Sequence, residues 1–256
     1  MNKATPFTRL SLLSLGLALL GGCASDNSKE AIRAKDAAAY NVQLGLAYMN
    51  QGDLAQAKDK LDRALKQNPD SADVHSARAY LYAHLNDPGQ ADSEFRTALR
   101  IAPKDPQIVN NYAVYLCQNG RTDEGVKRFL EAARNPLYQT PWVAYTNAGV
   151  CLHSAKRDDE ARANFERALQ VRPNFAEATY QLAGLVFTRG ELAPARARLD
   201  AYLSSFEETP DLLLLAVRVA RAQGDKAAAQ RYARKLQLDF PSSEQTRALA
   251  GLDRSG

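Results

Sequence analysis

Apolar residues recur along most of the chain at the three- and four-residue spacing of an amphipathic helix. One stretch has them at Leu54, Ala57, Leu61, Ala64 and Leu65, which lie on one stripe of an α-helix. Pro69 follows and cannot continue the i→i−4 hydrogen-bond ladder, so this helix is predicted to end before it. A shorter apolar stretch with Leu44, Gly45 and Tyr48 comes earlier, and Gly52 separates the two. The pattern predicts two helices joined by a tight turn.

The same pattern returns with a fixed period. Prolines stand at positions 69, 103, 173 and 241, with gaps of 34, 70 and 68 residues. Glycines stand at positions 52, 120, 190 and 224, with gaps of 68, 70 and 34 residues. Both series follow a 34-residue period that is broken once, by the two-residue insertion Thr140-Pro141. The chain therefore divides into six units, 38–71, 72–105, 106–139, 142–175, 176–209 and 210–243.

Small and aromatic residues occupy matching positions in these units. Alanine recurs at one position, as Ala57, Ala91, Ala161, Ala195 and Ala229, and an aromatic at another, as Phe95 and Phe165. These positions resemble the signature of the tetratricopeptide repeat. The resemblance implies an all-α solenoid of six helix-turn-helix repeats in a right-handed superhelix, whose concave face is lined by the first helix of each pair. Residues 244–256 form a C-terminal tail, either a last helix or a frayed end.

The N-terminus has the pattern of a secretory signal. Lys3 and Arg9 precede an uncharged apolar run over residues 10–20, which is followed by Gly21, Gly22 and Cys23. The run fits the apolar region of a signal peptide, and it is too short for a membrane-spanning helix, which needs about 20 apolar residues. Residues 1–22 are therefore predicted to be a cleaved signal peptide.

The residues around the cleavage point resemble the lipobox of bacterial lipoproteins. The resemblance implies that Cys23 is acylated and becomes the new N-terminus, and several acyl chains together anchor a protein durably. Ala24 stands where an Asp usually retains such proteins at the inner membrane. The resemblance thus implies the outer membrane of a Gram-negative bacterium, with the body in the periplasm. Residues 23–37, including the lipidated Cys23, are predicted to form a flexible tether.

Composition and charge exclude several function classes. Removal of the signal lowers the formal net charge from +4 to +2, which is too small and too mixed for a nucleic-acid footprint. The three His and three Cys form no His-Glu-x-x-His or Cys-x-x-Cys spacing. Asp158, Asp159 and Glu160 begin a predicted helix, where acids complement the helix dipole. We expect a non-enzymatic protein without catalytic residues, metal, cofactor or small-molecule substrate.

Cys117 and Cys151 are candidates for a disulfide, because an oxidising periplasm favours pairing of the two cysteines that remain besides Cys23. Cys117 is position 12 of unit three, and Cys151 is position 10 of unit four. Two residues turn a helix by about 200°, so one cysteine can face the next repeat while the other faces the previous one. The hypothesis is a bond across the junction that contains the insertion. The alternative is two reduced, buried cysteines.

The concave face offers a candidate partner-binding groove. Its positions hold apolar, aromatic and small polar residues, namely Val42, Leu46, Ser76, Tyr80, Asn110, Asn111, Val114, Thr146, Val150 and Tyr180. Apart from Asn110, the Lys and Asn clamp with which some tetratricopeptide domains hold a C-terminal carboxylate is missing. About half of these residues are expected to pack between repeats, and the others to bind an extended or helical apolar segment by burial.

Two blocks in units three and four resemble the PilF/PilW family of type IV pilus biogenesis lipoproteins. They are residues 110–117, Asn-Asn-Tyr-Ala-Val-Tyr-Leu-Cys, and residues 147–151, Asn-Ala-Gly-Val-Cys. The stretch Asn135-Pro136-Leu137-Tyr138 before the insertion belongs to the same resemblance. The family implies a protein that helps the secretin, the outer-membrane ring through which the pilus passes, to localise, assemble or stay stable. The secretin or another pilus assembly protein would be the partner. The alternative is a generic periplasmic scaffold lipoprotein for cell-wall or outer-membrane protein assembly.

Overall fold

The computed structural model describes residues 22–254, and this part of the chain is all α-helical, which confirms the predicted fold class. The helices are α1 (Gly22–Asn50), α2 (Leu54–Gln67), α3 (Ala72–His84), α4 (Pro88–Ile101), α5 (Pro106–Gln118), α6 (Thr122–Arg134), α7 (Pro141–Ser154), α8 (Asp158–Val171), α9 (Ala176–Thr188), α10 (Leu192–Leu203), α11 (Pro210–Ala222), α12 (Lys226–Asp239) and α13 (Glu244–Arg254). The predicted signal peptide lies almost entirely outside the described residues.

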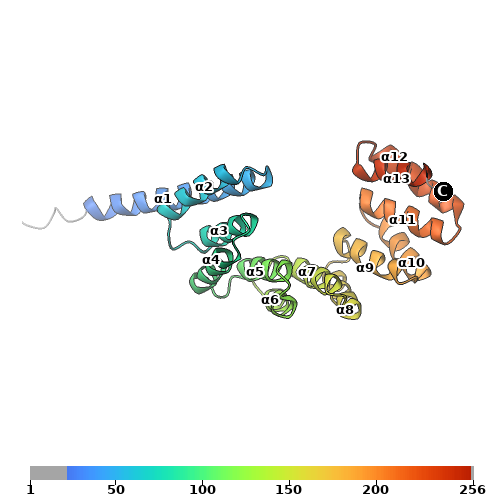
Figure 1. Cartoon of the computed structure of the whole chain (residues 1–256), viewed down its shortest axis with the longest axis horizontal. Coiled ribbons are helices and arrows are strands. Elements are labelled where there is room, and N and C mark those ends of the chain that lie inside the picture. Colours follow the sequence, from blue (N-terminus) through green and yellow to red (C-terminus); the bar gives the residue numbers. More distant parts are fainter. Residues whose placement is uncertain (1–21, 255–256) are drawn as a thin grey trace, which may run out of the picture.

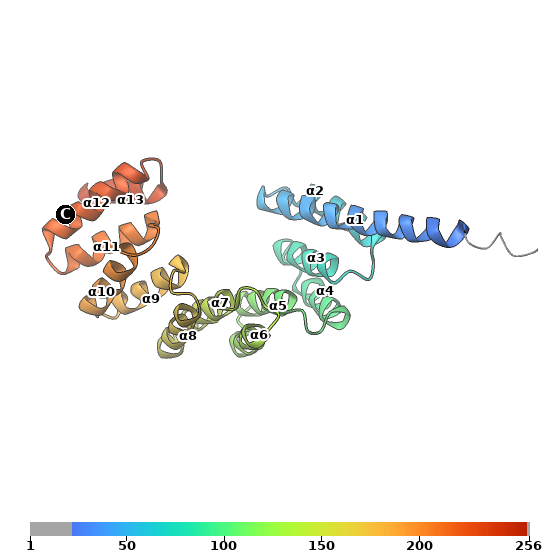
Figure 2. The same ribbon diagram turned by 180° about the vertical axis from the view of Figure 1, so that it is seen from behind.

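Consecutive helices form pairs that stack into a curved rod. Figure 1 shows this rod as an arch, and Figure 2 shows the same arch from behind. Each of the six predicted units contains one pair, and α3, α5, α9 and α11 begin at the first residue of their units. The first helix of each pair packs on the first helix of the next. The helices α3, α5, α7 and α9 lie on the inner side of the arch, and α4, α6, α8 and α10 lie on the outer side. The inner face is therefore built from first helices.

The turn inside each pair has the same backbone conformation in all six units. The fifteenth residue of each unit has a positive φ, at Gly52 (78°), Asn86 (56°), Gly120 (74°), Lys156 (63°), Gly190 (79°) and Gly224 (76°). Glycine adopts this left-handed conformation without the steric cost that a Cβ brings, and asparagine tolerates it. The periodic glycines of the sequence are therefore the residues that end the first helix and start the turn.

In units one and four, a large side chain of the second helix packs on a glycine of the first. Phe165 of α8 is fully buried, and its Cε1 would lie 2.4 Å from a Cβ built on Gly149 of α7. Leu61 of α2 approaches Gly45 of α1 in the same way, with its Cγ 2.7 Å from such a Cβ. Small residues at these positions let the two helices of a pair come close together.

The structure contradicts the flexible tether that was predicted for residues 23–37. These residues form the N-terminal half of α1, which continues beyond the end of α2 (Figure 1). Residues 28–37 are rich in Ala, Lys, Glu and Arg, which are strong helix formers. Packing of residues 38–50 against α2 nucleates the helix, so it propagates toward the N-terminus at little further cost. None of the helices within residues 22–254 has the length and apolar content that crossing a membrane takes.

The C-terminal tail forms a last helix. α13 packs against α11 and α12, with Leu249 fully buried. Thr246 Oγ1 donates a hydrogen bond of 2.8 Å to the carbonyl oxygen of Phe240, which fixes the start of the helix to the end of α12. Repeat stacks need such a cap because the last unit has no neighbour to cover its apolar face.

Charged side chains connect units one and two. Arg78 of α3 is 7% exposed, and it donates from Nε to Glu94 Oε1 of α4 (2.9 Å) and from Nη1 to Asp62 of α2. His75 Nδ1 lies 2.6 Å from Glu94 Oε2, and its Nε2 lies 2.8 Å from the carbonyl oxygen of Pro69. Only the protonated imidazolium donates from both nitrogens. The hydrogen bond with Glu94 accordingly raises the pKa of His75 above its usual range.

Raising the pH should remove the stabilisation that protonated His75 contributes. Because its folded pKa lies above the unfolded value of about 6.5, this contribution is complete below that value and is lost as the pH rises through the folded pKa. We expect His75→Gln to lower the free energy of unfolding by about 1–2 kcal/mol near pH 6, and by less near pH 9. Urea unfolding of both proteins at the two pH values measures this difference. An equal effect at both would contradict it.

Candidate partner-binding groove

A groove of about 540 Å³ lies at the N-terminal end of the inner face, between α1 and α3, with Asn111 of α5 at one side. It contains five of the residues predicted to bind a partner: Val42, Leu46, Ser76, Tyr80 and Asn111. Ala39, Val74 and Ala77 extend its apolar wall. The first helices of three consecutive units thus bring together side chains that are up to 76 residues apart in the sequence, from Lys35 to Asn111.

The groove has an apolar floor and a charged rim. Leu46 is 37% exposed, so a large part of this side chain is open to a ligand. Lys35, Asp36 and Asp73 supply one positive and two negative charges at the edge, and Ser71 caps α3 by accepting a hydrogen bond from the Val74 N–H. An apolar surface of this kind binds mainly by burial, while rim charges select and orient the ligand.

Tyr80 gives the groove a directional polar group. Its ring packs edge-to-face on Phe95, with the ring centroids 5.5 Å apart. Burial raises the pKa of Tyr80 to about 12, so the hydroxyl stays protonated and can donate a hydrogen bond. The residue lines the groove, so this hydroxyl belongs to the binding surface. A backbone carbonyl of a bound segment is the kind of acceptor that it can take.

Asn111 supplies the second polar group. Its Oδ1 accepts a hydrogen bond of 2.9 Å from Gln107 Nε2, one turn earlier on α5. This bond fixes the orientation of the amide, so Nδ2 is directed away from Gln107 and has two donors for a ligand. A neutral amide costs less to desolvate than a charged side chain, which suits a site that closes over an apolar segment.

The other predicted groove residues lie elsewhere, and two of them are buried. Asn110 is 4% exposed and accepts a hydrogen bond of 3.4 Å from Asn147 Nδ2 of α7. Thr146 is 3% exposed and donates from Oγ1 to the Trp142 carbonyl oxygen of its own helix. Burial leaves these two side chains little surface for a partner, and neither of them lines the groove. Val114 packs against the core between these units, and Val150 is partly exposed outside the groove.

Tyr180 lines a separate hollow of about 590 Å³ near the C-terminal end. This second hollow lies where the start of α9 meets the loop between α10 and α11, and Phe175, Tyr202 and Phe206 are among its walls. The predicted groove residues that line a hollow are therefore divided between two separate hollows.

Residues 35–39 of α1 complete the groove, and sequence reasoning missed them. Lys35, Asp36 and Ala39 line it because the helix continues through the segment that was predicted to be a tether. The signal that could have found them is the run of helix-forming residues immediately before the first repeat.

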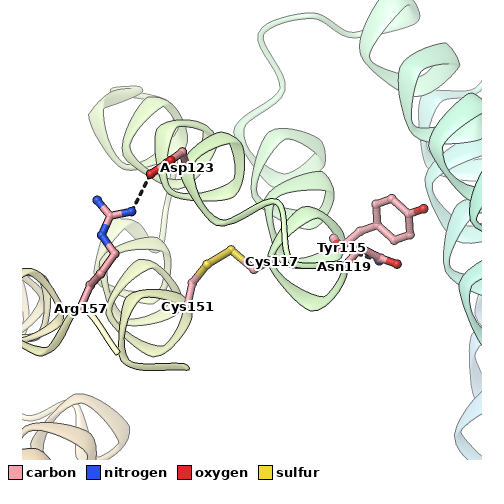
Figure 3. The surroundings of a disulfide bond; sticks show 6 residues. All are labelled: Tyr115, Cys117, Asn119, Asp123, Cys151 and Arg157. Carbon is pink, nitrogen blue, oxygen red and sulfur yellow. Dashed lines mark hydrogen bonds and ion pairs between the residues drawn. A yellow bond between two sulfur atoms is a disulfide. The ribbon is translucent and has the colours of Figure 1, made fainter. Parts of the chain in front are cut away.

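A disulfide ties unit three to unit four. The Sγ atoms of Cys117 on α5 and Cys151 on α7 are 2.01 Å apart, and the Cα atoms are 5.7 Å apart (Figure 3). The pairing predicted from the two repeat positions is therefore the one that the structure contains. Arg157 and Asp123 form an ion pair across the same junction, with Nη1 and Oδ1 2.5 Å apart (Figure 3).

Gly125 of α6 gives the disulfide its space. This glycine stands where most other units have alanine, and a Cβ built on it would lie 2.3 Å from Cys117 Sγ. Cys117 therefore occupies the volume that the alanine methyl fills in other units. The departure of unit three from the repeat pattern is a consequence of the disulfide.

The acidic run at the start of α8 is fully engaged in contacts with cations and a histidine. Asp158 Oδ1 lies 2.7 Å from His153 Nδ1, Asp159 pairs with Arg189, and Glu160 pairs with Arg157. Nowhere in the described part of the chain do three or more His, Cys, Asp or Glu side chains gather in a way that could hold a metal ion. Asp159 thereby links unit four to unit five, whereas Asp158 and Glu160 make their contacts within unit four.

Comparison with known proteins identifies the family. The tetratricopeptide repeat family matches residues 42–106 and 152–211. The type IV pilus assembly protein PilF of Pseudomonas aeruginosa is 31% identical over 237 residues, which are 91% of this chain and 92% of that protein. Its solved structure has a TM-score of 0.64 at 30% identity, covering 85% of this chain and 98% of that one.

PilW, described as a widely conserved type IV pilus biogenesis factor, has a solved structure that is similar to the same extent. The TM-score is 0.65 at 32% identity, over 83% of this chain and 98% of that one. Sequence identity and fold agree along nearly the whole repeat region. The chain therefore belongs to the PilF/PilW family of tetratricopeptide repeat proteins of type IV pilus biogenesis.

Proposed function

We propose that the chain is an outer-membrane lipoprotein whose inner-face groove holds a segment of the pilus secretin, or of another pilus assembly protein, while the secretin localises and assembles. The groove between α1 and α3 supports this proposal, because it combines an exposed apolar floor with polar donors at Tyr80 and Asn111. Such a surface binds a protein segment without transforming it, so the role is that of an adaptor.

The contacts favour an apolar segment that offers backbone carbonyls. Each methylene buried against Val42 and Leu46 contributes about 0.8 kcal/mol. Tyr80 and Asn111 then donate to acceptors of the segment, which fixes its direction in the groove. A segment that presents apolar side chains toward α1 and carbonyls toward α3 and α5 satisfies both kinds of contact.

A lipid on Cys23 would place the groove near the membrane, although the structure describes nothing of that side chain. Helical residues 23–37 span about 22 Å, which is shorter and stiffer than an extended tether of that length. The groove would then stay at a defined height above the lipid surface. Confinement near the secretin raises the local concentration of the two proteins without a need for tight contacts.

Replacing the predicted lipidation site tests the location. We expect Cys23→Ser to give a folded protein that leaves the outer-membrane fraction and supports fewer surface pili. Fractionation of cells, with circular dichroism of the purified protein as the folding control, measures both. Retention of Cys23→Ser in the outer membrane would contradict the anchor, and unchanged pili in a strain that lacks the protein would contradict the pilus role.

Placing a charge in the groove tests the binding surface. We expect Leu46→Asp to weaken binding of the purified secretin periplasmic domain by at least about tenfold, because a carboxylate cannot be buried there without a partner. Leu238→Asp is the matched control, since Leu238 is 78% exposed on α12 at the other end of the molecule. Calorimetry with both variants gives the affinities. Equal binding by both would exclude the groove, and co-purification of cell-wall or barrel-assembly proteins instead of secretin would favour the scaffold alternative.

A further inference from the structure

The loop between α6 and α7 holds an apolar side chain out into solvent. Leu137 is 74% exposed, while the next residue, Tyr138, is buried. Asn135 fixes the loop on both sides: its Oδ1 accepts from the Leu137 N–H (2.9 Å), and its Nδ2 donates to the Lys104 carbonyl oxygen in the α4–α5 loop (2.9 Å). A side chain on such a braced loop loses little conformational freedom on binding.

Polar residues follow the prolines near the ends of other units. The residue after the proline is Asp70, Lys104, Asn174 or Ser242 in four of them, whereas after Pro136, which stands one residue earlier in unit three, it is Leu137. Single exposed leucines are ordinary on protein surfaces. This one departs from an internal pattern of polar residues and stands on a loop that is held in place, so its exposure needs a reason beyond loop composition.

Leu137 stands between two hollows that differ in character. One, of about 770 Å³, is lined by apolar parts of the α4–α5 loop, including Pro103 and Pro106. The other, of about 670 Å³, is lined by Lys104, Lys127 and Arg134 together with one acid, Glu131. A hollow that can take an apolar side chain of a bound segment thus lies next to three cationic side chains.

These cations are free to pair with a ligand. No ion pair joins Lys104, Lys127 or Arg134 to any acid among the described residues. The nearby acids are engaged elsewhere: Glu131 pairs with Arg128 at 2.8 Å, and Asp105 caps α5 by accepting from two backbone N–H groups. The local field at this ridge is therefore positive and favours a negatively charged partner.

We infer that Leu137 and its two flanking hollows form a second docking site, separate from the inner-face groove, for a protein segment that carries both apolar and acidic side chains. Charge complementarity selects the acidic residues, and the hollows accept side chains on both sides of the leucine. A lipid surface is flat and does not fill hollows of this size, so a polypeptide fits the geometry better than a membrane does.

Photo-crosslinking in the bacterium that makes the protein tests this inference. The full-length chain carries p-benzoylphenylalanine in place of Leu137, or in place of the equally exposed Leu238 as the control. We expect a protein adduct at position 137 only, and mass spectrometry should place it on a segment that contains both carboxylates and apolar residues.

Charge reversal provides the second arm. Lys104→Glu, Lys127→Glu and Arg134→Glu together should lower the adduct yield by about tenfold, whereas reversal of the exposed Lys66, Lys226 and Arg234 should not. A phospholipid adduct would show that the ridge meets the membrane and would overturn the inference. An adduct no stronger than at position 238, a segment without carboxylates, or an unchanged yield after charge reversal would overturn it as well.

Discussion

Replacing both Cys117 and Cys151 by alanine is expected to lower the free energy of unfolding by about 3–4 kcal/mol. The bond closes a loop with a sequence separation of 34 residues. In the chain-entropy model, closing a loop of this size lowers the conformational entropy of the unfolded chain, which stabilises the folded state by this amount. The disulfide is lost at the junction between units three and four, so the unfolding of the two halves of the solenoid should also become less cooperative. Urea unfolding of the oxidised protein and of the double variant, followed by circular dichroism, measures the difference.

Gly125 and a reducing agent provide the controls for this prediction. Reduction should destabilise the natural protein and leave the double alanine variant unchanged. Gly125→Ala should destabilise the oxidised protein, because its Cβ would lie 2.3 Å from Cys117 Sγ. It should cost less once Cys117 is alanine, when the shortest remaining contact of this Cβ is 3.0 Å, to the Ala113 carbonyl oxygen. Two free thiols in the denatured, unreduced periplasmic protein would contradict the bond itself.

Phe165→Ala is expected to lower the free energy of unfolding by about 3–5 kcal/mol, the largest effect of a single substitution that we predict. The ring is fully buried and fills the space between α7 and α8 that Gly149 leaves open. Its removal leaves a cavity at the centre of unit four, next to the disulfide junction. Denaturant unfolding checks the value, and a loss below about 1 kcal/mol would show that the helices close over the gap.

A second substitution separates the cavity from a general loss of hydrophobic content. Gly149→Ala should cost about 1–3 kcal/mol, because the new methyl would overlap the Phe165 ring. Combined with Phe165→Leu, the same methyl has more room, so the double variant should be more stable than the sum of the two single effects predicts. Simple additivity would contradict the contact between these two residues.

Much of the fold could be predicted from the sequence because the same physical requirement recurs every 34 residues. Each turn needs a residue that tolerates a left-handed backbone, such as Gly52, and a proline such as Pro69 ends the second helix. Both signals are local, so they can be recognised within a single unit. The disulfide could be predicted for a related reason, since position in the repeat fixes the direction in which a side chain points.

The ends of the rod and the limits of the groove could not be predicted in this way. Residues 23–37 have no apolar stripe, and their helix depends on continuity with the packed part of α1. Ser76, Asn110 and Thr146 occupy the same first-helix position and are all buried, yet only Ser76 lines the groove, and the repeat pattern does not distinguish it from the other two. The exposure of a given repeat position depends on the local curvature of the stack, and the 34-residue period does not specify that curvature.

Twitching motility and secretin multimers in a strain whose chromosomal copy carries Leu46→Asp test the central claim most directly, with Leu238→Asp as the matched strain. If the inner-face groove holds the pilus partner, Leu46→Asp reduces twitching and heat-resistant secretin multimers while its own level and membrane fraction stay normal, and Leu238→Asp changes neither. Normal twitching and normal multimers with Leu46→Asp, at equal protein level, would contradict the account.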